Sequence, residues 1–244
     1  QEVAPSFLDA RLAAEALHAR GRLPEPDDTQ WRHTLREGTR ELLREDLDEI
    51  ESNTDLPAEH VMQVLRATAL AQGAGLPWAD VWPCAVKALT EGDITAPETV
   101  IRRVRESRLA GYLTTGIEDG MFVYRPIHER ISEVLRETSH ALLGDEATPG
   151  ALEASRVGTR EAHQRLAIAF SALQEAKDGP PHPYLRRHLI QHAAAGGVLN
   201  DDVVTEKFLA YETSGNVRGA LGLLSDHAAE RTRLFAWARI EPFL

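Results

Sequence analysis

The residues best suited to bind a ligand are Arg125 and His128, which lie where a strand-like pattern gives way to a helical one. Pro126 favours an extended Arg125 and has a φ suited to a first helical residue, so we expect it to open the helix. His128 would then lie in the first turn, where free backbone N–H groups favour an anion. The spacing predicts a phosphate-binding site at His128 and Arg125, with Glu129 beside it. The alternative is a half-buried histidine that packs against the preceding strands.

A β-hairpin must position these residues. Residues 109–115 and 121–125 are rich in β-branched and aromatic side chains, and residues 116–120 form a glycine-containing turn. The helix after the hairpin has apolar residues at helical spacing. These residues are Ile127, Ile131, Val134 and Leu135.

Three helical segments precede the hairpin. Residues 56–72 are amphipathic, residues 73–77 interrupt the pattern, and residues 78–89 form a second short helix. Thr95 and Glu98 have the spacing of a capping box, which predicts a third helix through residue 107. Three helices followed by a hairpin indicate a winged helix.

Several motifs of this chain together resemble the STAND class of signal-transduction ATPases. Ile127, His128 and Glu129 stand at the three positions of the family's Met-His-Asp signature. The Gly-Leu-Pro of residues 75–77, followed by Val81 and Trp82, is similar to the turn between the first two winged-helix helices of bacterial members. Residues 5–12 resemble the start of the small helical bundle after the ATPase core. Residues 183–189 resemble a helical segment that follows the winged helix.

The resemblance implies a regulatory role in a nucleotide-dependent switch. His128, helped by Arg125, would contact the β-phosphate of ADP held by a separate nucleotide-binding core. ATP or ADP with Mg²⁺ would belong to that core. The partners would be the chain's own core and a C-terminal sensor region, with homo-oligomers forming on activation.

The chain contains no Gly-x-x-x-x-Gly-Lys-Ser/Thr loop and begins at Gln1 without an initiator Met. We therefore expect a part of a longer protein that follows the core and has no enzymatic activity, no catalytic residues and no cofactor of its own.

A winged helix can also bind DNA, and the third helix and its end carry four arginines. These are Arg102, Arg103, Arg105 and Arg108. Glu98 and Glu106 interrupt this face, and residues 56–140 carry slightly more acidic than basic residues, so a salt-bridged surface is the favoured interpretation. The rival functions are a winged-helix transcriptional regulator with a helical effector domain and a non-catalytic helical interaction scaffold.

Other candidate sites have simpler explanations. His188 and His192 have the spacing of a zinc pair, with His182 as the nearest third ligand, but packing or surface histidines are the favoured interpretation. Cys84 follows Pro83 in an apolar segment, which favours a buried, unreactive thiol. Residues 45–51 are acidic and are most simply the solvated face of a helix end.

Composition indicates a compartment and a fold class. The 244 residues carry a net charge of −11 and a single cysteine, which fits a reducing cytoplasm. No apolar run approaches the length of a membrane span, and the acidic balance makes nucleic acid an improbable partner. We expect a mainly α protein in three units: a helical bundle segment (1–52), a winged helix with one small β-hairpin (53–142) and a C-terminal antiparallel helical array (155–244).

The remaining segments follow from periodicity and turn residues. Helices are predicted at 7–19 and 29–49, with a loop at 21–28 between them and a separating segment at 52–55. The clearest linker covers residues 144–150. Five further helices are predicted at 156–176, 183–195, 201–211, 216–224 and 225–239.

Overall fold

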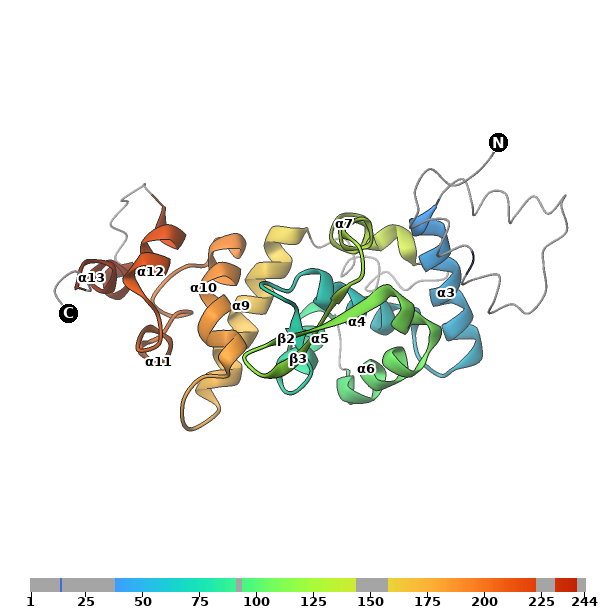
Figure 1. The fold of residues 1–244 in the computed structure, drawn as a ribbon, viewed down its shortest axis with the longest axis horizontal. Helices are drawn as coiled ribbons and strands as arrows, with labels where there is room; N and C mark the ends of the chain where they lie inside the picture. The colour runs from blue at the N-terminus through green and yellow to red at the C-terminus, as the bar shows by residue number, and fades with distance from the viewer. Residues whose placement is uncertain (1–13, 15–37, 91–93, 144–157, 223–230, 241–244) are drawn as a thin grey trace, which may run out of the picture.

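The computed structural model describes residue 14 and residues 38–90, 94–143, 158–222 and 231–240. Within these ranges the protein is mainly α with one small antiparallel sheet, which confirms the predicted fold class. The elements follow one another along an elongated body, with the first described helix and the last at opposite ends (Figure 1). The predicted helix at 7–19, the loop at 21–28 and the linker at 144–150 lie outside the described residues or nearly so.

The first described helix is α3 (Thr39–Asn53), which ends inside the segment 52–55 that was expected to separate two units. Leu42, Leu43 and Leu47 are buried and form its inner face. Its acidic end is not wholly solvated, because Asp46 is buried and accepts a hydrogen bond from the Tyr112 hydroxyl at 2.8 Å. The helix is thereby tied to the segment just before the hairpin.

Three helices and a hairpin form the predicted winged helix. The helices are α4 (Ala58–Ala69), α5 (Val81–Leu89) and α6 (Pro97–Glu106). The expected capping box at Thr95 is wrong: the N-cap of α6 is Ala96, and no side chain caps the helix. Pro97 instead occupies the start of α6, where its fixed φ suits the first turn and its missing N–H costs nothing.

The sheet has three strands in the order β1-β3-β2. They are β1 (Leu76–Pro77), β2 (Leu113–Glu118) and β3 (Met121–Pro126). Strand β1 was not predicted, because two residues are too few to show alternation. The predicted limits of the first hairpin strand were also wrong. Residues Arg108–Tyr112 form a 3-10 turn, and the strand continues to Glu118.

The hairpin turn is tighter than the five residues expected. Only Asp119 and Gly120 lie between the paired ends Glu118 and Met121. Their φ angles are 51° and 75°, as a two-residue turn of type I′ requires. The Asp-Gly pair therefore fixes the register of β2 against β3, and with it the face on which each side chain lies.

Trp82 is central to the packing of the winged helix. Its side chain is fully buried, and its indole N–H donates to the Val64 carbonyl oxygen at 3.1 Å. The Tyr124 ring from β3 lies 5.1 Å from it and the Trp78 ring 6.1 Å from it, measured between centroids. This contact joins α4, α5 and the hairpin into one core.

Beyond residue 157 the described residues form five further helices. They are α9 (Thr159–Glu175), α10 (Pro183–Gly196), α11 (Glu206–Leu209), α12 (Ser214–Leu221) and α13 (Thr232–Ile240). Helices α9 and α10 form a closely packed pair, and α9 also covers α5 of the winged helix. The described part of the chain contains no helix with the length and apolar character needed to cross a bilayer.

The prediction of one helix over 201–211 was wrong. The Asn200 side-chain oxygen accepts hydrogen bonds from the backbone N–H groups of Asp202 and Val203, at 3.1 and 3.0 Å. This local bonding offers the backbone an alternative to the helix, and the helix begins only at Glu206.

Candidate phosphate-binding pocket

The segment from β3 into the next helix differs from the prediction by about one turn. Pro126 is the last residue of β3, and helix α7 (Glu129–Glu137) begins three residues later. The backbone N–H of Ile127 donates to the Tyr112 carbonyl oxygen at 2.9 Å, which keeps the chain extended beyond the proline. His128 is the N-cap of α7 rather than a residue of its first turn.

The cap fixes the chemistry of the His128 ring. Its Nδ1 accepts a hydrogen bond from the Arg130 backbone N–H at 3.1 Å. A neutral imidazole that accepts at Nδ1 must carry its proton on Nε2. His128 is exposed, and its Nε2–H can donate to a ligand.

Arg125 and His128 line one pocket of about 310 Å³. Glu129, Ser132 and Arg136 from α7 complete one wall. The opposite wall is formed by the end of α4 and the loop after it. These lining residues are Thr68, Ala69, Ala71, Gly73 and Gly75. The structure thus brings together the two residues that the sequence singled out.

Arg136 is a third cationic group in this pocket, and it was not among the predicted site residues. Its guanidinium donates to the Ala69 carbonyl oxygen at 3.4 Å and forms an ion pair with Glu129. Glu129 and Arg136 are seven residues apart, about two helical turns, so they lie on one face of α7. That spacing is the signal that could have identified Arg136 from the sequence.

The pocket therefore offers three donors of positive or partly positive charge against one carboxylate. Arg125, His128 and Arg136 could each donate to an anion, while Glu129 is already paired with Arg136. Among the described residues no group of three or more His, Cys, Asp or Glu side chains is placed to hold a metal ion. The arrangement is suited to binding oxygen atoms of a phosphate.

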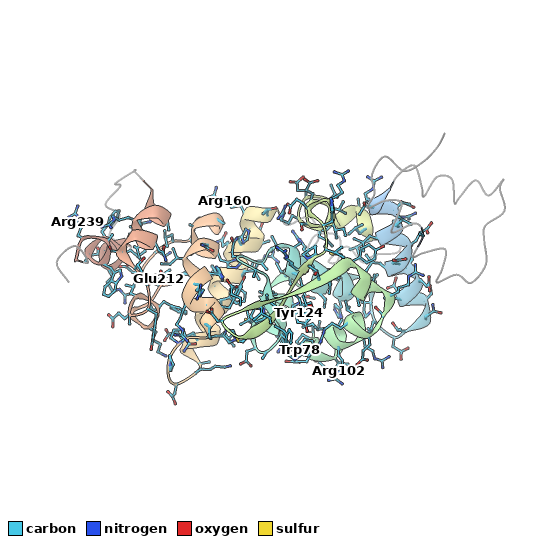
Figure 2. All side chains as sticks on the ribbon, in the orientation of Figure 1. Trp78, Arg102, Tyr124, Arg160, Glu212 and Arg239 are labelled. Carbon is cyan, nitrogen blue, oxygen red and sulfur yellow. The ribbon has the colours of Figure 1, made fainter. Side chains whose placement is uncertain are left out.

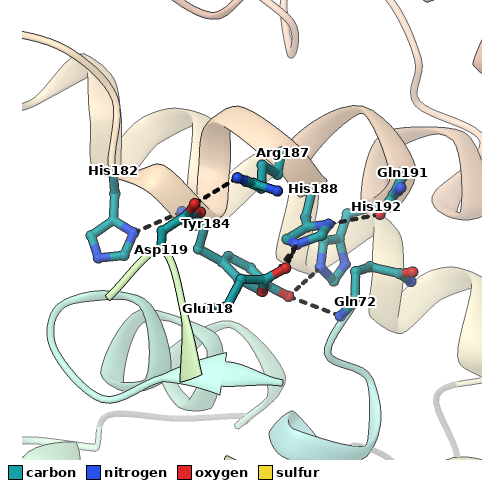
Figure 3. Close-up of polar contacts among 9 residues, drawn as sticks. All are labelled: Gln72, Glu118, Asp119, His182, Tyr184, Arg187, His188, Gln191 and His192. Carbon is teal, nitrogen blue, oxygen red and sulfur yellow. Dashed lines mark hydrogen bonds and ion pairs between the residues drawn. The ribbon is translucent and has the colours of Figure 1, made fainter. Parts of the chain in front are cut away.

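The other predicted histidines belong to a buried polar network between the winged helix and α10 (Figure 3). The Tyr184 hydroxyl lies 3.0 Å from the His192 Nε2 atom, and the Gln72 backbone N–H donates to the same hydroxyl at 3.0 Å. His192 is fully buried, and its Nδ1 lies 2.9 Å from the Nδ1 of His163 on α9. Burial lowers the pKa of both histidines, so the neutral forms are favoured.

His188 and His192 have different hydrogen-bond partners in the described part of the chain. The His188 Nε2 atom lies 3.4 Å from the Glu118 carboxylate at the hairpin, and its Nδ1 lies 2.8 Å from the Gln191 side-chain oxygen. His182 instead caps α10, where its Nδ1 accepts from the Tyr184 backbone N–H at 3.2 Å. The favoured packing interpretation therefore describes all three histidines.

The four arginines predicted on the third helix and its end lie in three environments, and the last of them, Arg108, belongs to the 3-10 turn after α6. The Arg105 guanidinium carbon lies 4.6 Å from the Trp78 ring centroid and 4.8 Å from that of Tyr124. Arg108 forms ion pairs with Asp46 and Glu49. Arg102 and Arg103 are exposed, and Figure 2 shows Arg102 further along the same side of the molecule as Trp78 and Tyr124.

Cys84 is half-buried between α5 and α9. Its thiol donates to the Ala169 carbonyl oxygen on α9 at 3.5 Å, and burial raises the pKa of the thiol to about 11. A thiol with so high a pKa forms little thiolate at neutral pH, which agrees with the unreactive thiol expected from the sequence.

Comparisons of the chain with protein-family models, curated proteins and solved structures found no significant match.

Proposed function

We propose that this chain is the regulatory arm of a STAND-type ATP-dependent signalling switch. The observation that carries the proposal is the convergence of Arg125, His128 and Arg136 in one pocket at the start of α7. This pocket directly follows a winged-helix hairpin, in the order that the family resemblance implies. The proposed partners are a nucleotide-binding core and a sensor region of the same protein.

In this proposal the pocket contacts the phosphates of a nucleotide held by the core. The His128 Nε2–H and the Arg125 guanidinium donate to phosphate oxygens, and Arg136 adds charge while it stays anchored to Ala69 and Glu129. Each charge-assisted hydrogen bond would contribute roughly 1.5–3 kcal/mol. ADP or ATP and Mg²⁺ remain ligands of the core, so the chain itself would not hydrolyse nucleotide.

The contact biases a two-state rotation. It exists only in a closed state, in which the winged helix covers the core, so it stabilises closure when ADP is bound. Opening on nucleotide exchange would carry the pocket away and permit oligomerisation. A ligand can shift such an equilibrium only by its difference in affinity for the two states, and these hydrogen bonds supply that difference.

The decisive test uses the full-length protein. If the sequence upstream of Gln1 encodes a phosphate-binding loop, the dissociation rate of a fluorescent ADP analogue can be compared between wild type and His128→Ala. We expect dissociation to accelerate by about ten-fold or more, as the loss of one such bond requires. Arg130→Ala is the matched control, because Arg130 lies two residues after His128 in the first turn of α7 and its side chain pairs with Glu133 outside the pocket. Equal rates in all three proteins, or an upstream sequence without such a loop, would contradict the proposal.

A further inference from the structure

A second and larger polar pocket lies at the opposite end of the hairpin from α7. Its volume is about 640 Å³, within the usual range for small-molecule sites. It is formed by the hairpin turn, the outer face of α10 and the segment before α12. The residues used below are Asp119, Arg186, Arg187, Tyr211, Glu212 and Asn216.

The Arg186 guanidinium is held in place through its Nε atom. Its Nε donates to the Pro181 carbonyl oxygen at 2.9 Å, and its guanidinium carbon lies 5.0 Å from the centroid of the Tyr211 ring. Its two terminal amino groups form no hydrogen bond with the described part of the chain. A guanidinium that is fixed at Nε and open at both Nη atoms presents a rigid pair of donors to the pocket.

Arg187 provides a second guanidinium that can change partner. It pairs with Asp119 at the tip of the hairpin, at 2.6 Å, and its side chain is 58% exposed (Figure 3). Because the Arg187 side chain is largely exposed and stays solvated without its partner, this ion pair contributes little net stability. An incoming anion therefore loses little by taking Arg187 from Asp119.

The second carboxylate at the pocket is already bonded. Glu212 is buried, and the Asn216 side-chain amide donates to it at 3.2 Å. Burial also raises the pKa of Glu212, which opposes its full ionisation at mildly acidic pH. Arg186 is thus the charged group of the pocket whose donors are not already used.

We propose that this pocket binds the phosphate groups of a small phosphorylated molecule. Two adjacent guanidinium groups match the several acceptor oxygens of a phosphate better than the two of a carboxylate. Arg186 makes the fixed contact, and Arg187 moves from Asp119 to the phosphate. The ligand also weakens the contact of the hairpin tip with α10. This site shares no residue with the pocket at His128 and stands independently of the proposed function.

The geometry predicts that substitution of either arginine weakens ligand binding, whereas substitution of Asp119 strengthens it. Arg186→Gln and Arg187→Gln remove donors, so each should weaken pyrophosphate binding by about ten-fold, the effect of one charge-assisted bond. Asp119→Asn removes the competitor of the phosphate and should tighten binding several-fold. Asparagine also tolerates the positive φ of this turn position, so the hairpin is retained.

The test is a titration of the whole 244-residue chain with pyrophosphate at constant ionic strength, followed by the Nε–H resonances of the arginines in nitrogen-15 NMR spectra. We expect the Arg186 and Arg187 resonances to shift together with one dissociation constant. Arg102→Gln on α6 and Arg125→Gln at the other pocket are the controls and should leave that constant unchanged. Arg187→Gln tests the proposal even if Arg186→Gln loosens the fold, because Arg187 is exposed. Unchanged affinity in Arg187→Gln, weaker binding in Asp119→Asn, or shifts confined to Arg125 would overturn the proposal.

Discussion

The Nδ1 atoms of His163 and His192 face each other at 2.9 Å, inside the seam between α9 and α10. Only one of the two atoms can carry the shared proton, because two N–H donors at this distance would repel each other. The pair is therefore compatible with two neutral rings, or with one charged ring at most. A buried position disfavours even the single charge.

This relationship predicts a loss of stability on acidification. Burial lowers the pKa of His163 and His192 below the ordinary value of 6.5, so the unfolded chain binds protons that the folded protein excludes. Their contribution is complete above pH 6.5 and is lost as the pH falls from 6.5 toward the folded-state pKa values. For each proton excluded, the free energy of unfolding falls by about 1.4 kcal/mol per pH unit.

Urea unfolding between pH 7.5 and 5 measures this dependence. Other titratable or charged groups act on the pair, namely Tyr184 and His188 on α10 and Arg136 on α7, and Glu118 on the hairpin acts in turn on Tyr184. The comparison is therefore between wild type and His163→Gln, which should have a clearly shallower slope. Parallel slopes in wild type and His163→Gln would reject the explanation.

Tyr184→Phe should destabilise the protein. The hydroxyl accepts from the Gln72 backbone N–H and contacts the His192 Nε2, so its removal leaves two buried polar groups without this partner. The expected cost is about 1–3 kcal/mol in the free energy of unfolding. Tyr211→Phe is the control, because Tyr211 is 48% exposed and should change stability by less than about 0.5 kcal/mol. Equal effects of the two substitutions would argue against the network as a source of stability.

Gly73→Ala should be more harmful than Gly120→Ala. Both glycines have positive φ, so both substitutions cost about 1–2 kcal/mol in backbone strain. A Cβ at residue 73 would lie 2.6 Å from the His188 ring, whereas a Cβ at residue 120 meets nothing within 4 Å. Overpacking should add about 1–3 kcal/mol at residue 73 alone. Thermal unfolding of both variants measures the difference, and similar melting temperatures would contradict the close approach of the loop to α10.

DNA binding should be weak at physiological salt. Arg105 stacks on aromatic rings and Arg108 pairs with carboxylates, so the remaining positive charges of this set are those of Arg102 and Arg103. So few free charges release few counterions from a duplex. A gel-shift titration should therefore give no sequence-selective complex at submicromolar protein. A selective complex lost in Arg102→Ala would instead support the transcriptional regulator.

Long periodic segments made the helices and the hairpin predictable, but local hydrogen bonds set their ends. From the sequence, Pro126 could either begin a helix or end a strand. The hydrogen bond from the Ile127 N–H to the Tyr112 carbonyl oxygen keeps this segment extended, so Pro126 ends the strand. In the same way, the hydrogen bond that the Asn200 side chain accepts from the Asp202 N–H keeps this segment out of the helix, so α11 begins later than predicted. Neither contact produces a periodic pattern in the sequence.

The candidate site was predicted in part. Arg125 and His128 are near neighbours in the chain, so their spacing sufficed to place them together. To predict Arg136 one would have had to know which face of α7 it lies on. To predict the wall formed by the end of α4 and Gly73 one would have had to know a tertiary contact between segments more than 50 residues apart. The second pocket combines the hairpin turn with α10 and the segment before α12, which no local spacing could reveal.

The loop after α4 gives the winged helix and the helical array a common interior. Gln72 bonds to Tyr184 on α10, Gly73 abuts His188, and Cys84 on α5 bonds to Ala169 on α9. These contacts between the winged helix and the helical array limit the places at which the chain can be divided without exposing buried residues. A cut between η2 (Ser139–Leu142) and α9 would expose the apolar face of α5 and break the hydrogen bond between the Gln72 N–H and the Tyr184 hydroxyl. An exchange of the C-terminal helices for other helices would thus have to keep α9 and α10 together with the wing, with the new junction placed beyond Gly197.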